Sequence, residues 1–218
     1  KSFIDFGCGN GSTAFAFLKR NAKHGHLIDF GEKSIKAAKI YSKKLNLTKK
    51  TSFEVADITK YRTKKKYDFV ICSAVLHHLK DTKTIFKTLK NISKVCNDGA
   101  HFYVYTRGKG GMLNNMQDMV RTVFQKTDIE IIRKILFDAN LSRPKITFLV
   151  DYFKAIYLQH TPLEFENMMK KCGFLSFRRL KGPHKIDYDI NQIKSHKHSE
   201  LKFGSGELRY LAKFTEEK

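Results

Sequence analysis

The first hundred residues of the chain alternate short apolar runs with amphipathic stretches. The apolar runs have the length of buried strands, at 2–6, 26–30, 51–56, 67–73 and 100–105. The fourth run is almost continuously apolar, as expected for a strand covered on both faces. Between the runs, the apolar spacing predicts helices at 12–21, 32–45 and 82–95. This alternation predicts an α/β fold with a mostly parallel sheet and helices on both faces.

The alternation stops after the fifth strand. Residues 112–160 have helical apolar spacing with a break at Pro144, and we expect a helical cap inserted here. Thr161 and Pro162 suit the N-cap and first position of a further helix, and Gly173 suits its end. Two closing strands are expected at 174–180 and 207–214, and a turn at 97–99. One domain covering 1–218 accounts for all these elements.

Composition bounds the setting of the protein. The hydrophobic fraction of 41% is ordinary for a globular chain, and no apolar run approaches the roughly 20 residues of a membrane helix. No signal peptide is visible, and the four cysteines form no C-x-x-C pair, so we expect a reducing, cytoplasmic setting without a zinc site. The chain opens without Met and almost directly on a strand, so we expect residues upstream of Lys1.

The formal net charge of +21 admits a polyanionic partner such as RNA. Nine of the 42 basic residues are Arg and the other 33 are Lys. Arg is the residue that binds phosphates in a bidentate manner, and it is not enriched here. The Lys, Ile, Phe and Asn content also fits an AT-rich coding sequence. Nucleic-acid binding therefore stays an alternative, resting on the charge and on the basic stretch 181–202.

A glycine-rich segment lies between the first strand and the first helix, and reads Asp5-Phe6-Gly7-Cys8-Gly9-Asn10-Gly11. Glycines let the backbone turn tightly and approach a ligand, while the helix that follows offers unpaired N–H groups. The fingerprint for dinucleotides is G-x-G-x-x-G or G-x-G-x-x-A, whereas this chain has G-x-G-x-G with Ser at position 12. A nicotinamide cofactor is therefore disfavoured.

The pattern Asp5-x-Gly7-x-Gly9-x-Gly11 resembles the first motif of the Rossmann-like (class I) S-adenosylmethionine-dependent methyltransferases, of the small-molecule type. Later segments resemble the family's motifs in the same order. Leu27-Ile28-Asp29-Phe30 resembles the second, and Val55-Ala56-Asp57-Ile58 the third. The segment 71–79, with Ser73, His77 and His78, is similar to the stretch after the fourth strand. The turn 97–99 departs from the family pattern by having a single glycine.

The resemblance implies a seven-stranded, mostly parallel sheet whose last strand is antiparallel, and S-adenosylmethionine as cofactor. It implies that Asp5 orients the loop and the methionine part, that Asp29 accepts both ribose hydroxyls, and that Asp57 binds the adenine amino group. Asp57 as a helix N-cap, and Asp5 as a structural carboxylate, stay open. The cofactor-binding residues carried over are Asp5, Gly7, Cys8, Gly9, Gly11, Asp29, Phe30, Asp57, Ile58 and Ser73.

His77 and His78 follow the fourth strand, where the methyl group lies in this family. One of them is expected to contact the acceptor or take its proton; the alternative is structural packing and a contact with cofactor backbone. Arg107 and Lys109 follow the fifth strand and are expected to hold an anionic substrate group, or else to lie in a solvated loop. No metal is expected, since neither the His77-His78 pair nor His196-x-His198 has convincing ligand spacing.

We therefore expect methyl transfer to a small-molecule metabolite, with the oxygen, nitrogen or carbon acceptor left open. The fourth-strand segment lacks the Asn/Asp-Pro-Pro-Tyr/Phe signature of amino methylation on bases. An RNA methyltransferase and a non-catalytic cofactor-binding partner subunit are the alternatives. Four cap aromatics at helical spacing either pack in a core or wall an apolar substrate: Phe148, Tyr152, Phe153 and Tyr157.

Overall fold

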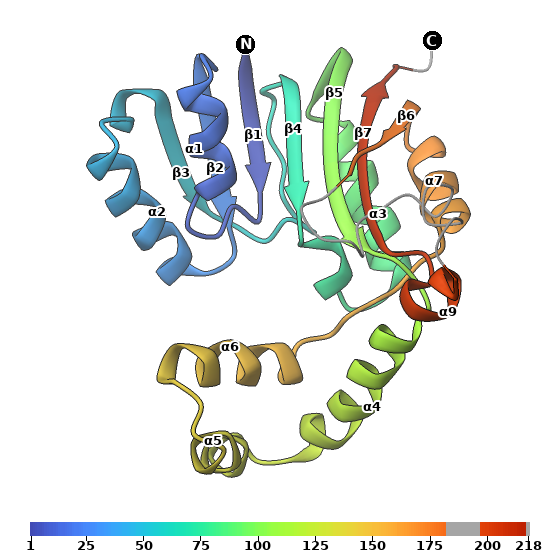
Figure 1. The fold of residues 1–218 in the computed structure, drawn as a ribbon. Coiled ribbons are helices and arrows are strands. Elements are labelled where there is room, and N and C mark those ends of the chain that lie inside the picture. Colours follow the sequence, from blue (N-terminus) through green and yellow to red (C-terminus); the bar gives the residue numbers. More distant parts are fainter. Residues whose placement is uncertain (182–196, 217–218) are drawn as a thin grey trace.

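The computed structural model describes residues 1–181 and 197–216 (Figure 1). Its strands form one seven-stranded sheet in the order β3-β2-β1-β4-β5-β7-β6. They are β1 (Ser2–Phe6), β2 (His24–Asp29), β3 (Thr51–Val55), β4 (Tyr67–Ser73), β5 (Cys96–Arg107), β6 (Phe174–Arg179) and β7 (Glu207–Phe214). The first five pair in parallel, and β7 is antiparallel to both β5 and β6. The expected sheet and its reversed last strand are confirmed.

Helices cover both faces of the sheet, as Figure 1 shows. They are α1 (Ser12–Lys19), α2 (Glu32–Lys44), α3 (Thr82–Ser93), α4 (Met112–Lys126), α5 (Ile129–Asp138), α6 (Arg143–Lys154), α7 (Pro162–Lys170) and α9 (Ser199–Phe203), with 3-10 turns η1 (Thr48–Lys50) and η2 (Leu76–His78). α1 and α2 pack on one face and α3 and α7 on the other. The carboxyl ends of β1, β2 and β4 are thereby left open to ligands.

Strand alternation divides the core into two layers. Phe3 of β1 packs with α1 and α2, whereas Ile4 and Phe6 pack in the layer that holds α3 and α7. Successive side chains of a strand point to opposite faces, so one short apolar run supplies both layers. Burial on both faces is the physical reason why the strands read as continuous apolar runs.

The expected turn at 97–99 is wrong, because β5 already begins at Cys96. Tyr67 of β4 pairs with Cys96 and Phe69 pairs with His101, so β5 contains extra residues over that interval. Gly99 has φ +74°, which suits a bulge of this kind. The Asn-Asp-Gly segment is therefore an irregularity within the strand and does not connect two elements.

The inserted cap consists of α4, α5 and α6, which lie beyond the carboxyl edge of the sheet (Figure 1). It has a small core of its own around Ile132, Leu136, Ile146 and Val150. The helical prediction is wrong for residues 155–160, here called the strap. Its backbone returns to the sheet, where Leu158 N–H donates to the His77 carbonyl at 2.8 Å.

The strap leads into α7, which starts as predicted with Thr161 as N-cap and Pro162 in the first turn. Glu164, which the sequence analysis did not single out, completes a reciprocal capping box with Thr161. Among the described residues, no helix is both long and apolar enough to cross a membrane. Most of the basic stretch 181–202, including His196, lies outside the described residues.

Candidate functional site

The glycine loop after β1 is tied to the end of β2. The N–H groups of Gly7 and Cys8 both donate to the Ile28 carbonyl, at 2.8 and 2.9 Å. A Cβ atom added at Gly11 would lie 2.6 Å from the ring of Phe15. A Cβ atom added at Gly9 would meet no protein atom within 4 Å. Gly11 is therefore needed for packing, whereas the loop leaves open space above Gly9.

The Asp29 carboxylate holds this loop from the second strand. Its Oδ2 accepts the Gly9 N–H and its Oδ1 accepts the Gly31 N–H, both at 2.8 Å. A carboxylate offers about four acceptor positions, so these two bonds leave capacity for two more. A vicinal diol such as that of ribose needs two acceptors. The residues present therefore fit the expected cofactor at this point.

Asp5 lies behind the loop and is only 2% exposed. Its Oδ2 is buried and has no hydrogen-bond partner. Burial, and then the nearby charge of Asp29, raise the pKa of Asp5 from 3.8 to about 8. A buried carboxyl group of this kind would be ionised more readily by a cation beside it, such as an α-ammonium group.

A cavity of about 450 Å³ opens at the carboxyl ends of β1, β2, β3 and β4. Its lining includes Gly7 of the loop, Asp29 and Phe30 after β2, and Asp57 and Ile58 after β3. Phe30 is 80% exposed and therefore has a free ring face. Asp57 Oδ1 accepts from both the N–H and the hydroxyl of Thr59, which lowers its pKa. This bonding resembles a cap, although the described chain forms no helix there.

The other expected cofactor residues lie outside the cavity lining. Asp5 and Cys8 are buried, Gly9 and Gly11 form the loop, and Ser73 ends β4. The sequence reasoning missed four lining residues, Ala56, Ala74, Val75 and Leu79. The signal for Ala56 and Ala74 was a small apolar residue directly after the end of β3 or β4, whereas Leu79 follows η2 and carried no such signal.

The two consecutive histidines lie in different environments. His78 lines the cavity, and its Nδ1 is 2.9 Å from the Ile156 carbonyl. Since a carbonyl only accepts, Nδ1 carries the proton and Nε2 holds the lone pair in the neutral ring. His77 is 4% exposed and stacks on Tyr157 at 5.3 Å between ring centroids. Burial, with the charges of His78 and two arginines, lowers the pKa of His77 to about 3.

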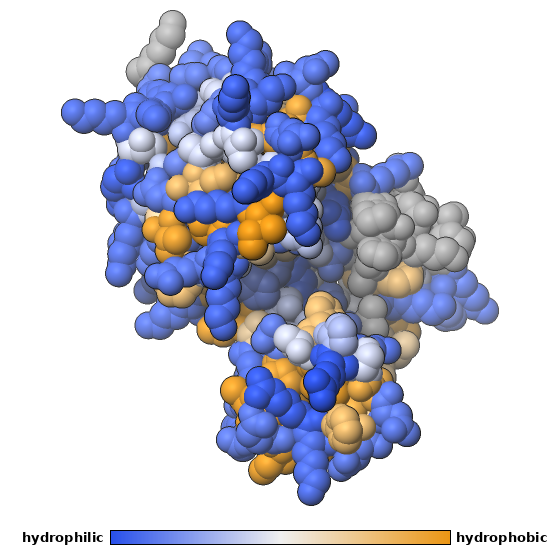
Figure 2. Space-filling model, turned by 90° about the vertical axis from the view of Figure 1, so that its left-hand side faces the viewer, coloured by the Kyte–Doolittle hydropathy of each residue, from blue (hydrophilic) through white to orange (hydrophobic). Residues whose placement is uncertain are grey.

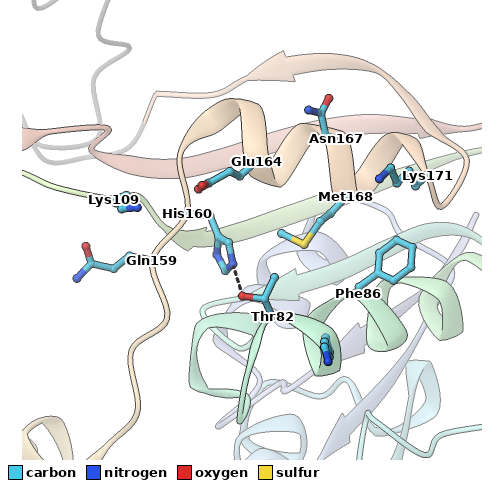
Figure 3. Close-up of a pocket in the computed structure, with 10 residues that line it drawn as sticks. Thr82, Phe86, Lys109, Gln159, His160, Glu164, Asn167, Met168 and Lys171 are labelled. Carbon is cyan, nitrogen blue, oxygen red and sulfur yellow. Dashed lines mark hydrogen bonds between the residues drawn. The ribbon is translucent and has the colours of Figure 1, made fainter.

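The side chains of Arg107 and Lys109 do not point into the same site. Arg107 is buried at the end of β5, where its Nη2 donates to Asn114 and Gln117 of α4. Lys109 instead lines a second cavity of about 640 Å³ between α3 and α7, seen in Figure 3. There His160 contacts Thr82, and the apolar side chains of Met168 and Phe86 lie beside this pair (Figure 3). A single anionic group held by Arg107 and Lys109 together is therefore not supported.

The aromatic residues expected in the cap also lie in different environments. Phe153 stacks on Phe124 at 4.6 Å, against the small core of the cap. Tyr157, in the strap, lies 4.6 Å from His78 and 5.1 Å from Tyr152 between ring centroids. Phe148 is 65% exposed. In the described part of the chain, no three or more His, Cys, Asp or Glu residues are grouped so as to hold a metal ion.

Comparison with known proteins identifies the family. A family model described as a methyltransferase domain matches residues 1–173. A search of curated proteins finds no match. Among solved structures, this chain is similar to magnesium protoporphyrin IX methyltransferase from Synechocystis PCC 6803 with bound S-adenosylhomocysteine. The TM-score is 0.64 at 16% identity, over 98% of this chain and 74% of that chain.

Two further structures are similar. The N-methyltransferase NodS from Bradyrhizobium japonicum WM9, with S-adenosylhomocysteine, has a TM-score of 0.58 at 12% identity, over 99% of this chain and 79% of that chain. A putative methyltransferase in complex with the Haloferax volcanii Trm112 activator has a TM-score of 0.61 at 15% identity, over 100% of this chain and 83% of that chain. At these identities the likenesses show the fold.

Proposed function

Because this chain belongs to the class I S-adenosylmethionine-dependent methyltransferases, we propose that it methylates a small-molecule acceptor bound between the cofactor cavity and the cap. The observation that carries this proposal is the cavity of about 450 Å³, lined from four strand ends. His78, which lines this cavity, contacts the Ile156 carbonyl of the strap, the segment that leads back from the cap. An acceptor in this position would meet the cofactor on one side and the cap on the other.

The cofactor, when bound, supplies a methyl group on a sulfonium, which is already activated for transfer. We assign Asp29 to the ribose hydroxyls, with its two loop hydrogen bonds fixing the carboxylate beforehand. Phe30 and Ile58 would contact the adenine, and Asp57 its amino group through the oxygen not bonded to Thr59. The protein's contribution is to hold and align the two reactants and to exclude water.

His78 is the group that we assign to the acceptor. Its Nδ1–H is held by the Ile156 carbonyl, so its Nε2 is the atom that would accept a proton from a hydroxyl or amine. Burial lowers the pKa of His78, as do the nearby charges of Arg121 and Arg107, so the neutral form is present at neutral pH. His77, buried against Tyr157, would position this wall without touching the acceptor.

The cap favours a small acceptor over RNA. The α4–α6 cap lies over the carboxyl edge, and Figure 2 shows the hollow between it and the sheet layer. The basic charge is the observation that favours RNA. Since most of the stretch 181–202 lies outside the described residues, that alternative is left to experiment.

The test is to incubate the protein with methyl-labelled cofactor and cell extract, and then to separate RNA, lipid and low-mass fractions. Label in the low-mass fraction supports the proposal, and label in RNA that nuclease releases overturns it. An Asp29→Ala variant serves as the control for cofactor-dependent label. Tight cofactor binding without label in any fraction would instead favour a non-catalytic partner subunit.

The role of His78 is tested separately once a product is known. His78→Ala should lower turnover at least about a hundredfold, the usual contribution of a general base, with cofactor affinity kept. His101→Ala, which changes an exposed histidine in the middle of β5, is the matched control. Unchanged turnover in His78→Ala would remove the proton-transfer role but leave the methyltransferase assignment intact.

A further inference from the structure

Two arginines are buried at the joint between the cap and the sheet. Arg107 ends β5 and Arg121 lies in α4, and they are 4% and 5% exposed. Arginine is rarely buried so fully unless it is paired. Only Arg107 was expected in the site from the sequence, because Arg121 carries no motif.

The two guanidinium groups share one carboxylate. Arg121 Nη1 donates to Asp118 Oδ1 at 2.7 Å, and Arg107 Nη1 lies 4.0 Å from the same oxygen. The other oxygen of Asp118 accepts from the side chain of Gln159 in the strap. Asp118 therefore acts as an internal anion between two cations, and it is 39% exposed at its side chain. Glu207 pairs with Arg107 in register across β5 and β7.

Two guanidinium nitrogens of this cluster make no hydrogen bond. Arg107 Nη1 and Arg121 Nε are both buried without a hydrogen-bond partner. Leaving a buried donor unsatisfied costs about 1–3 kcal/mol, and more for a charged group. A guanidinium presents its donors in a flat fork that matches a carboxylate or phosphate. These unpartnered donors are therefore of the kind to which an oxyanion can bind.

The ring of Tyr157 lies between this cluster and His78, which lines the cofactor cavity. Tyr157 lies 4.6 Å from His78 between ring centroids, and the Arg121 guanidinium lies 4.3 Å from the centroid of the same ring. Arg107 lies 5.1 Å from it. An acceptor molecule whose reactive group reaches His78 would thus extend toward the two arginines.

We propose that Arg107 and Arg121 form an oxyanion subsite for the acceptor molecule, which carries a carboxylate or phosphate that competes with Asp118. The substrate class is thus an anionic small molecule, and the inference rests on the proposed function. Because the orphan donors are covered, the anion enters as the cap moves away from the end of β5. The separate core of the cap lets α4–α6 move as a unit, and the bound anion would then hold the joint closed.

In this arrangement Arg121, and not Lys109, is the partner of Arg107.

The alternative is that the two arginines only hold the cap to the sheet through the same ion pairs. The two explanations predict different results for Asp118→Asn. If the arginines only hold the cap, loss of Asp118 weakens the joint and gains no ligand. If they bind an anion, loss of Asp118 removes its internal competitor, so anion affinity increases.

The experiment titrates ¹⁵N-labelled protein, saturated with S-adenosylhomocysteine, with inorganic phosphate and with acetate at constant ionic strength. The side-chain Nε–H resonance of Arg121, assigned from its loss in Arg121→Lys, reports hydrogen bonding at the orphan donor. We expect a saturable downfield shift in wild type, about tenfold weaker affinity in Arg121→Gln, as for one lost charged hydrogen bond, and tighter affinity in Asp118→Asn.

Arg133→Gln, an exposed arginine of α5, is the matched control and should bind like wild type. Melting temperatures show that each variant is folded; should Arg121→Gln unfold, Arg121→Lys with the Arg107 resonance serves in its place. No saturable shift, or Asp118→Asn binding more weakly than wild type, overturns the subsite. Failure to bind S-adenosylhomocysteine would instead refute the cofactor site, and the titration of the free protein still tests the arginines.

Discussion

The Asp5→Asn substitution tests whether the buried carboxyl group behind the glycine loop is protonated in the folded protein. In the folded chain the pKa of Asp5 rises to about 8, first because of burial and then because of the charge of Asp29. In the unfolded chain it returns to an ordinary value near 3.8. The folded state therefore binds one more proton than the unfolded state at intermediate pH.

The sign of the effect follows from this difference. Below about pH 3.8 both states hold the proton and Asp5 has no influence on the pH dependence. As pH rises toward 8 the unfolded state ionises freely while the folded state does not, so stability decreases. Between pH 6 and pH 8 the loss is about 2 kcal/mol, since one proton corresponds to about 1.4 kcal/mol per pH unit below the folded pKa. For a domain of this size, that is roughly 4–8 °C of melting temperature.

The assay is urea unfolding of cofactor-free wild type and Asp5→Asn at pH 6, 7 and 8. Wild type should lose about 2 kcal/mol over this range relative to the variant, whose amide cannot ionise. Among the described residues, five histidines have a lowered pKa, and they do not confound the comparison because their effect is shared by both proteins: His24, His26, His77, His78 and His160.

Asp29→Asn gives a second reading of the same reasoning. Removing the charge of Asp29 should lower the pKa of Asp5 in the folded protein, so the loss of stability ends at a lower pH and is smaller between pH 6 and pH 8. Parallel pH profiles for wild type and Asp5→Asn would refute the argument, because Asp5 would then be ionised in the folded protein. A difference that stops growing between pH 6 and pH 7 would likewise place the pKa of Asp5 below the predicted value.

Four further substitutions have outcomes fixed by the local geometry. Gly11→Ala should cost about 2 kcal/mol or more in urea unfolding, because its Cβ atom overlaps the Phe15 ring at a φ of +83°. Gly9→Ala, with open space but a φ of +54°, should cost about 1 kcal/mol or more and should weaken binding of S-adenosylhomocysteine in calorimetry; unchanged affinity would mean that the ligand keeps away from the loop. Phe30→Ala should leave the melting temperature within about 2 °C, since the ring is 80% exposed, yet lower cofactor affinity about tenfold. Thr161→Ala should destabilise by about 1 kcal/mol through loss of the capping box, and a Tm equal to wild type would contradict this.

Local pattern was sufficient for most of the elements. The bounds of β1, β4 and β7 match the expectation, because buried strands and their flanking turns leave a periodic record in the sequence. The Thr161 N-cap and Pro162 at the start of α7 were also predicted, since these residues are neighbours in the sequence. The 97–99 segment failed because its turn composition is equally compatible with a bulge in a paired strand.

The meeting of several proposed cofactor-binding residues in one cavity could be expected from the sequence for a related reason. Parallel strands bring their carboxyl ends to one edge, so Gly7, Asp29 and Asp57 at successive strand ends must meet there. What the pattern could not give was the separation of His77 from His78, or of Arg107 from Lys109. Neighbours in sequence diverge when the chain leaves regular structure, and their surroundings depend on which distant segments return to them.

The sequence by itself determined the sheet, its covering helices and the strand-end acids, because those features depend on periodicity and on residues near in sequence. Only the tertiary structure paired Arg121 of α4 with Arg107 of β5 and brought Tyr157 against both histidines. These contacts depend on the path of the cap and on the strap, which turns from helix to extended chain after Lys154. Packing between segments far apart in sequence produces no periodic hydrophobic pattern in either segment. Only the tertiary structure could therefore decide which of these residues come into contact.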